Sequence, residues 1–275
     1  MTSQNGDDGQ NKHREQISVH SLHRYPVKGL SAENLDTVTV EANRCFPFDR
    51  AYAIENGPSR FNAKEPKFLP KINFLALMKH ERLARLDTSF EAETETLTIF
   101  REGRQVAKGN LSTSIGRNMI EQFIAAFMRE ELKGPPKLLS AHSQFPNHAP
   151  SHHFADCPDP LVHIITTASA KALEVILNDQ VDLKRFRSNI VLETTTPWVE
   201  KQWGGKNIKI GDVEIEIVDE TGRCAAINVD LATGKRGRSI PATLTQHFSN
   251  ENFGIYGKII KGGQLSLKDT AQIIG

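Results

Sequence analysis

Short segments in which apolar and polar residues alternate recur along this sequence, and they constrain the fold more than any other feature. ISVHSLHRYPV and LDTVTVEA show the pattern near the N-terminus, and RAYAIE, ETLTIF, NIKIG and VEIEIVD repeat it. Because successive side chains of a strand point to opposite faces, this spacing is typical of strands with one buried face. The chain is therefore predicted to be rich in β-structure.

Three segments depart from that pattern and favour helices. Ser112, Thr113 or Ser114 can cap the first, and LKGPPK ends it. LVHIITTASAKALEVIL reads as a buried strand that runs into a helix, with Thr167 or Ser169 near its cap, and PATLTQHF as a short helix. Many strands with few helices predict the α+β class: a β-barrel core with flanking helices, and a smaller β lobe within the first ~100 residues. Apolar residues at helical spacing mark the first helix: Ile115, Met119, Ile120, Phe123, Ile124 and Phe127.

Charge and cysteine usage narrow the class of protein. A formal charge of +1 gives no electrostatic reason to expect a nucleic-acid partner. Cys45, Cys157 and Cys224 are odd in number and far apart, which argues against a disulfide framework and for a reducing compartment. Residues 1–16 are polar and are expected to form a disordered tail. The chain shows no signal peptide or bilayer-spanning run, so we expect a cytoplasmic protein, with attachment to an organelle surface also compatible.

Several polar motifs are candidates for a binding site. ETGRC places Cys224 after a strand, and RYPVKG places Lys28 in a turn. RFRSN precedes the strand IVLE. In a strand, Arg185 and Arg187 share one face and make a compact positive site that suits an anion, and Asn189 points the same way. Taken alone, such a pair is more often an ordinary charged surface than an anion site.

Two further motifs have alternative interpretations. TTAS, with Thr166 and Ser169, lies at a strand-to-helix junction that suits either an anion or a simple helix cap. The polar, proline-rich stretch from Ser140 to Pro160 predicts a long loop at the mouth of a site. It contains His148, His152, His153 and Cys157, but no second Cys or His pair completes a zinc-site spacing.

The order of these motifs resembles that of a known family. YPVKG, FDRAYAI, FNAKEPKFLPKI, TTAS, RFRSNIV, PWVEKQW, IGDVEIEIV, GRC, DLATG and FGIY follow one another between residues 17 and 274. This arrangement resembles the MOSC family, which includes the C-terminal domain of molybdenum cofactor sulfurases and the amidoxime-reducing proteins. The resemblance implies a tail over 1–16, an N-terminal MOSC β-barrel domain over 17–105 and a MOSC domain over 106–275.

The resemblance also implies roles for particular residues. Cys224 matches the thiolate ligand of molybdenum, and therefore the catalytic position. Three departures stand out: Gly29 where Ser is common, Ser188 where the family usually has Pro, and Lys268-Asp269 where Gly-Asp is expected. The implied cofactor-binding residues are Lys28, Arg50, Thr166, Ser169, Arg187 and Asn189.

The implied function is that of a molybdenum-cofactor-binding oxidoreductase. It would reduce small N-hydroxylated substrates such as amidoximes and hydroxylamines. Three distant cysteines cannot hold a four-cysteine iron–sulfur cluster, so electrons would come from a flavoprotein or haem-containing reductase. Pyridoxal phosphate binding is a further association of the family at large. The alternative is a non-catalytic molybdenum cofactor carrier or a sulfur-handling domain.

Overall fold

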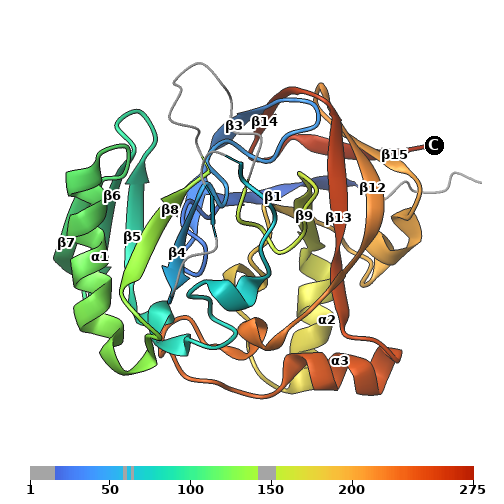
Figure 1. The fold of residues 1–275 in the computed structure, drawn as a ribbon. Helices are drawn as coiled ribbons and strands as arrows, with labels where there is room; N and C mark the ends of the chain where they lie inside the picture. The colour runs from blue at the N-terminus through green and yellow to red at the C-terminus, as the bar shows by residue number, and fades with distance from the viewer. Residues whose placement is uncertain (1–15, 58–60, 63–64, 142–152) are drawn as a thin grey trace, which may run out of the picture.

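The computed structural model describes residues 16–57, 61–62, 65–141 and 153–275 (Figure 1). Residues 1–15 of the expected tail lie outside that part. Among the described residues, no helix is both long enough and apolar enough to cross a membrane. The elements used below are β1 (Ile17–Arg24), β2 (Glu33–Leu35), β3 (Thr37–Val40), β4 (Tyr52–Asn56), η1 (Lys71–Asn73), β5 (Asp87–Glu91), β6 (Thr96–Arg101), β7 (Arg104–Asn110), α1 (Ser114–Met128), β8 (Pro136–Ser140), β9 (Val162–Thr166), α2 (Thr167–Leu177), η4 (Leu183–Phe186), β10 (Ile190–Glu193), η5 (Val199–Trp203), β11 (Asn207–Ile210), β12 (Val213–Gly222), η6 (Ala225–Asn228), α3 (Ile240–Phe248), β13 (Asn252–Lys261), β14 (Gly263–Ser266) and β15 (Thr270–Ile274).

A closed barrel of seven strands forms the larger half of the molecule. Its order is β10-β9-β13-β12-β11-β15-β1, and β1 closes the ring by pairing with β10. Only β9 and β10 run parallel within this ring; every other pairing is antiparallel. Alternate side chains of these strands fill the interior, as the alternating sequence pattern requires. The predicted α+β fold with a β-barrel core is confirmed.

The closure is made by a strand from the start of the chain. In β1, Ile17 pairs with Ala271 of β15, while Leu22 pairs with Ile190 of β10. Ile17 and Leu22 are buried in the same apolar cluster as the C-terminal strands. The barrel is thus built from both ends of the sequence.

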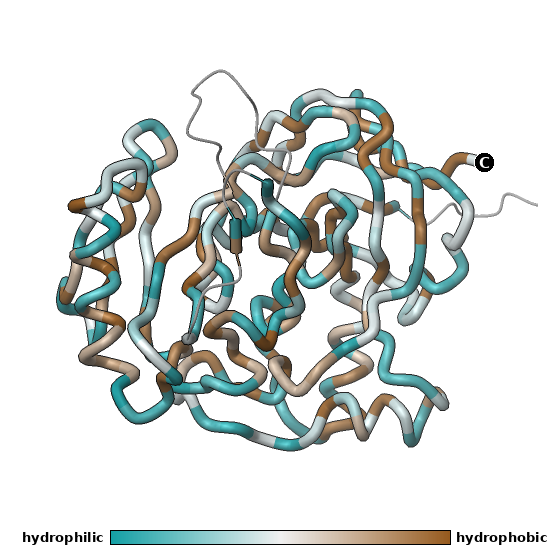
Figure 2. Tube along the Cα trace, viewed as in Figure 1, coloured by the Kyte–Doolittle hydropathy of each residue, from teal (hydrophilic) through white to brown (hydrophobic). Residues whose placement is uncertain are grey.

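A smaller lobe packs beside the barrel and contains the sheet β5-β6-β7, the pair β4-β8 and α1 (Figure 1). Figure 2 shows hydrophobic and hydrophilic residues alternating along its elements, consistent with one buried face. The expected domain boundary after residue 105 falls inside β7, which is hydrogen-bonded to β6. Because α1 and β8 also pack in this lobe, it continues to about Ser140. The expected boundary and the lobe boundary therefore do not coincide.

The start of α1 shows why it lies so close to β7. Thr113 is the N-cap and accepts a hydrogen bond from the backbone of Gly116 at 3.0 Å, so one of the three predicted caps is confirmed. A Cβ atom on Gly116 would lie 2.0 Å from the carbonyl oxygen of Asn110. Glycine is therefore required here by close packing of the helix against β7.

The two predicted helices of the second half cover one end of the barrel (Figure 1). α2 follows β9, and α3 packs against it through an apolar cluster that includes Leu173, Leu244 and Phe253. The N-cap of α2 is Thr166, one residue before Thr167 and three before Ser169, the two positions expected from the sequence. It accepts from the Ser169 backbone at 3.4 Å.

Candidate cofactor site

A cavity of 310 Å³ lies where the end of the barrel meets the smaller lobe. Its walls come from the YPVKG turn, the segment before β4, η1, residues 155–161, the turn after η4 and the end of β12. Five basic and two acidic side chains line it, so these groups alone give a formal charge of +3. They are Lys28, Arg50, Lys71, Arg187 and Arg223, with Asp49 and Asp156.

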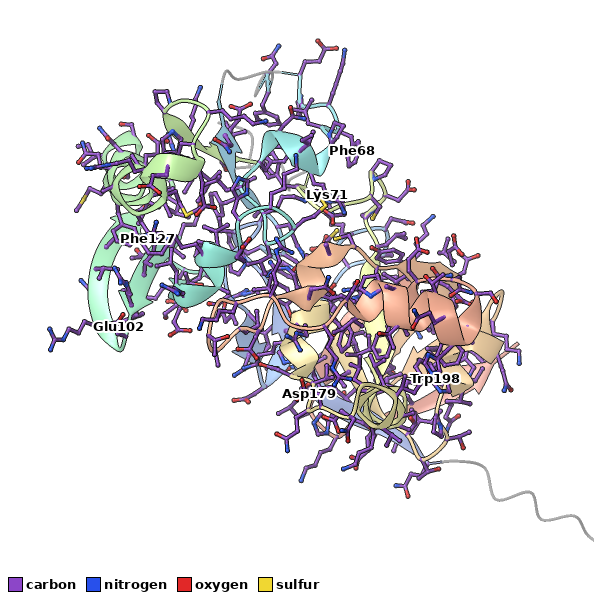
Figure 3. All side chains as sticks on the ribbon, turned by 90° about the horizontal axis from the view of Figure 1, so that it is seen from below. Phe68, Lys71, Glu102, Phe127, Asp179 and Trp198 are labelled. Carbon is purple, nitrogen blue, oxygen red and sulfur yellow. The ribbon has the colours of Figure 1, made fainter. Side chains whose placement is uncertain are left out.

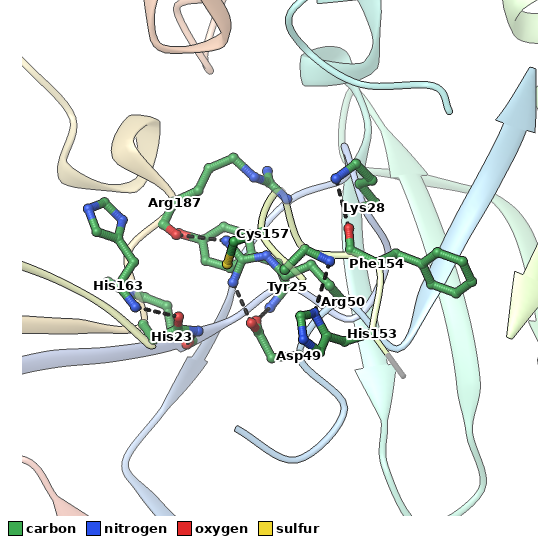
Figure 4. Close-up of polar contacts among 12 residues, drawn as sticks. His23, Tyr25, Lys28, Asp49, Arg50, His153, Phe154, Cys157, His163 and Arg187 are labelled. Carbon is green, nitrogen blue, oxygen red and sulfur yellow. Dashed lines mark hydrogen bonds and ion pairs between the residues drawn. The ribbon is translucent and has the colours of Figure 1, made fainter. Parts of the chain in front are cut away.

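Arg50 and Arg187 line one side of the cavity, and their guanidinium groups pack on the ring of Tyr25 (Figure 4). Their guanidinium carbons lie 4.5 and 4.2 Å from the centroid of the Tyr25 ring. Arg50 donates to the backbone oxygen of Arg187 at 2.8 Å and to Asp49 at 2.5 Å. Both arginines have positive φ, 50° and 55°. Such left-handed backbone costs free energy in a non-glycine residue and tends to occur at functional sites.

Arg187 is short of partners. Its Nη1 donates to the Leu30 carbonyl at 2.8 Å, but its buried Nη2 has no hydrogen-bond partner among the described residues. Burial, and then repulsion from Arg50, lower the pKa of Arg187 to about 10. A buried donor without an acceptor is costly, and an incoming anion would stabilise it.

On another wall, two lysines share one carboxylate. Lys28 donates from Nζ to Asp156 at 2.5 Å and to the carbonyl of Phe154 at 2.7 Å, and Lys71 donates to the other Asp156 oxygen at 3.2 Å. Burial favours a raised pKa for Asp156, but Lys28 and Lys71 outweigh it and hold the pKa well below its usual range. Burial lowers the pKa of Lys28 in spite of the carboxylate.

Cys224 follows β12 and lines the same cavity with a half-buried, free thiol. Lys71 lies close to the Cys224 sulfur. Burial lowers the pKa of Lys71, but Asp156 and then the hydrogen-bonded sulfur of Cys224 more than offset this effect, so the pKa of Lys71 is raised.

Arg223 precedes Cys224 in the sequence and also lines the cavity. It donates to the Phe186 carbonyl at 2.6 Å, and its buried Nε lacks a partner among the described residues. Burial, and then Arg223, place the pKa of His163 well below its usual value, so this ring is neutral.

The structure brings five of the seven expected site residues to this cavity: Lys28, Arg50, Arg187, Asn189 and Cys224. Asn189 is buried, and both ends of its amide are already used. It accepts from the His163 backbone at 3.1 Å and donates to the His23 carbonyl at 3.2 Å. Asn189 therefore ties β9 to β1 beneath the cavity.

Thr166 and Ser169 do not reach the cavity. Both are fully buried, and their hydroxyls donate to one oxygen of Glu200 at 3.0 and 2.8 Å. Ser169 also accepts from the backbone of Trp198 at 2.7 Å. Figure 3 shows Trp198 and Lys71 in separate parts of the molecule. The junction is thus a helix cap tied to a buried carboxylate, the simpler of the two interpretations.

The expected strand face shared by Arg185 and Arg187 is wrong. Leu183–Phe186 forms the 3-10 helix η4, and Arg187 follows it in left-handed conformation. The two side chains therefore diverge: Arg185 donates to the Val229 carbonyl at 3.0 Å and is not among the residues lining the cavity. Asp182 caps η4 by accepting from the Lys184 backbone, and the strand β10 begins only at Ile190.

The histidine-rich stretch is only partly covered. His148 and His152 lie outside the described residues. Within the described part of the chain, no group of three or more His, Cys, Asp or Glu side chains is arranged to hold a metal ion. Cys157, however, lines the cavity, and its pKa is raised by burial and then by Asp156.

Four charged residues of the cavity were not predicted from the sequence: Asp49, Lys71, Asp156 and Arg223. Lys71 lies in FNAKEPKFLPKI, a stretch that matched the family order without any residue being singled out. Asp156 lies in the stretch from Ser140 to Pro160, in which only the histidines and Cys157 were candidate ligands from the sequence. Arg223 directly precedes Cys224, which is the one local signal that could have identified it.

Comparisons with known proteins agree with this architecture. The model of the MOSC N-terminal beta barrel domain matches residues 16–134, and that of the MOSC domain matches residues 149–272. The chain is 36% identical over 97 residues to the molybdenum cofactor sulfurase of Caenorhabditis elegans, covering 34% of this chain and 13% of that protein. It is 30% identical over 128 residues to mitochondrial amidoxime reducing component 2 of Rattus norvegicus, covering 42% of this chain and 37% of that protein.

This chain thus spans well under half of the length of either relative. Among solved structures, the YUAD protein from Bacillus subtilis has a TM-score of 0.43 at 8% identity, with 94% of this chain and 95% of that chain covered. The two matched family models together account for most of the chain. It therefore belongs to the MOSC family, with a MOSC N-terminal beta barrel domain followed by a MOSC domain.

Proposed function

We propose that this chain binds the molybdenum cofactor in the cavity and reduces N-hydroxylated compounds, such as amidoximes and hydroxylamines. One observation carries the proposal: a thiol and five basic side chains line a single cavity, and two of the buried guanidinium groups keep an N–H that has no partner among the described residues. A relative named as an amidoxime reducing component supports the choice of substrate class.

The residues fit such a cofactor chemically. A phosphate needs cationic and N–H donors, which Lys28, Arg50 and the unpartnered Nη2 of Arg187 supply. Cys224 supplies a soft thiolate, the ligand type that suits molybdenum bound by a dithiolene. When bound, the cofactor supplies a two-electron centre for removing oxygen from the substrate. Thr166 and Ser169 are left out of this cradle because Glu200 already engages their hydroxyls.

The chain's own side chains also define the edge of the cavity. The raised pKa of Tyr256, caused by burial and then by Cys157, keeps its phenol protonated at neutral pH. That hydroxyl can donate to a polar substrate at the cavity wall. Electrons come from a separate flavoprotein or haem-containing reductase in this proposal, because three cysteines cannot hold an iron–sulfur cluster of four cysteines.

A second candidate is a molybdenum cofactor carrier or a sulfur-handling domain. Cys157 favours it, because this second thiol lines the same cavity as Cys224. The relatives named molybdenum cofactor sulfurase point in the same direction. The two candidates share the cofactor and differ in whether a reduced, loaded protein turns over substrate.

The test uses protein from a host that makes the cofactor. Elemental analysis should find about one molybdenum per chain, and benzamidoxime should be reduced with a chemical reductant or a reductase system but not with NADH or NADPH alone. A loaded and reduced protein that converts no N-hydroxylated compound would leave the carrier as the better description. Absence of molybdenum in the purified protein would reject both candidates.

A further inference from the structure

The cavity holds two carboxylates that differ sharply in how firmly they are fixed. Asp49 accepts from the Tyr25 backbone at 2.8 Å and from Arg50 at 2.5 Å, with one bond to each oxygen. Its side chain is 4% exposed, whereas that of Asp156 is 44% exposed. Asp49 is thus part of the wall, whereas Asp156 projects into the cavity.

Among the described residues, the carboxylate of Asp156 bonds only to Lys28 and Lys71, the two lysines of the cavity, which together form a lysine cradle. Its oxygens accept from Lys28 and Lys71, and no other hydrogen bond to its carboxylate is present among the described residues. It lies in the irregular stretch 155–159, outside any strand or helix. That stretch follows Phe154, which is fixed by a backbone bond to Arg50 at 2.8 Å and by ring contacts with Phe61 and Phe74. The carboxylate can therefore turn away without breaking a sheet hydrogen bond.

Asp156 does not satisfy every hydrogen-bond donor of the cavity. A carboxylate has two oxygens and one negative charge, and both oxygens are used by the lysines. The buried Nη2 of Arg187 remains without a partner in the part of the chain that the structure describes. A phosphate monoester has three free oxygens and about two negative charges, so it can engage both lysines and a guanidinium at once.

We propose that Asp156 is an internal counter-ion that occupies the lysine cradle until a phosphate-bearing ligand displaces it. The inference rests on the proposed function, because it assumes that the cavity receives a phosphate group. An anion can bind only after Asp156 has left the lysines. The apparent affinity for every anion is therefore the intrinsic affinity multiplied by the fraction of molecules in which Asp156 has left. Ligands that can also reach Arg187 overcome this competition, and simple monoanions do not.

The experiment compares Asp156→Asn with a matched variant, Asp159→Asn. Asp159 lies three residues further along the same stretch, is exposed and does not line the cavity, so its change removes the same charge without touching the lysines. Each protein is made in a host that lacks molybdopterin and is titrated calorimetrically with inorganic phosphate in an otherwise phosphate-free buffer. We expect Asp156→Asn to bind phosphate roughly tenfold more tightly than wild type, and Asp159→Asn to bind like wild type.

Thermal unfolding gives a second readout that does not depend on activity. Without phosphate, Asp156→Asn should melt at a lower temperature than wild type, because Lys28 and Lys71 lose their shared counter-ion. Saturating phosphate should close that gap. A gap that persists at saturating phosphate means that Asp156 has a purely structural role and overturns the exchange.

The outcomes separate this inference from the proposed function. If phosphate binds wild type and Asp156→Asn equally, the exchange is wrong while the cradle stands. If phosphate binds neither protein, the cradle and the exchange fail together. If Asp156→Asn binds more tightly but protein from a cofactor-producing host contains no molybdenum, the exchange holds and the proposed function fails.

Discussion

Two polar clusters near the ends of barrel strands looked alike in the sequence and differ in the structure. The cavity has five cations, two carboxylates and buried N–H groups for which the described residues provide no acceptor. The cluster of Thr166, Ser169 and Glu200 has two hydroxyl donors that both bond to one carboxylate oxygen. Both clusters come from motifs that suit anions at a strand end.

The difference shows that motif chemistry alone does not make a binding site. An anion can gain from the cavity because donors there remain unsatisfied, but it gains nothing from hydroxyls already engaged by Glu200. Packing decides whether the donors at a strand end are satisfied. η5 places Glu200 against the start of α2, where it accepts from Ser169, whereas a cavity remains between the end of β12 and the smaller lobe. The following changes test this contrast, from the largest expected effect to the smallest.

Replacing Cys224 by Ala should have the largest effect. Turnover of benzamidoxime by chemically reduced protein should fall by more than the roughly 10–100-fold typical of losing a group that only orients a metal ligand. The fold should persist, because the side chain is small and half-buried. Cys45→Ala is the control, since Cys45 is also a free, partly exposed cysteine but does not line the cavity. Unchanged turnover in Cys224→Ala contradicts the ligand assignment.

Arg187→Ala should weaken cofactor retention by about 1.5–3 kcal/mol, or one to two decades, because a charge-assisted hydrogen bond is lost. Arg187→Lys should not restore it, because an ammonium cannot replace the planar fork. Arg185→Ala removes the same charge two residues away, outside the cavity, and should retain the cofactor. Molybdenum content per folded chain measures the effect, and equal contents in both alanine variants would count against the cradle.

Ser169→Ala should lower the stability of the fold without changing the cofactor content. It removes a donor to buried Glu200 and the acceptor of the Trp198 backbone N–H, so unfolding free energy should fall by about 1–2 kcal/mol. Chemical denaturation measures this change. A normal stability with reduced molybdenum content would reverse the assignment and place Ser169 at the cofactor.

Glu200→Gln should give the smallest effect, a change in the pH dependence of stability. Burial raises the pKa of Glu200 above its ordinary value of 4.5. The folded state therefore binds this proton more tightly, and wild-type stability should decrease as pH rises from 4.5 through the raised pKa. The glutamine variant should lose that component of the slope. Denaturation curves over this pH range test it, and parallel slopes for the two proteins contradict it.

The sequence was sufficient for features that depend on near neighbours. The alternating strands, the cap at Thr113 and the three helices were predictable because periodicity and capping act within a few residues. Lys28, Arg50 and Cys224 followed from the order of short motifs. Their meeting in one cavity is what the structure adds.

Features that depend on distant partners were not predictable. Nothing near Ser169 indicates that Glu200 will face it, and the left-handed turn at Arg187 depends on η4 rather than on the strand that follows. Asp156 was not predictable as a cavity residue because its partners, Lys28 and Lys71, lie far away in the sequence. Long-range contacts, not local propensity, set these outcomes.

The closure of the barrel by β1 has a consequence for the order of folding. β1 leaves the ribosome before its neighbours β10 and β15 exist, yet Ile17 must finally lie beside Ala271. β2 can pair early with the C-terminal end of β1, but until β10 and β15 form the rest of its edges is open to pairing with other chains. Contacts between such distant segments slow folding, because a long loop must be closed before they form. We therefore expect the smaller lobe, whose β4, β5, β6, β7 and β8 pair within one stretch of chain, to form first and the barrel to close last.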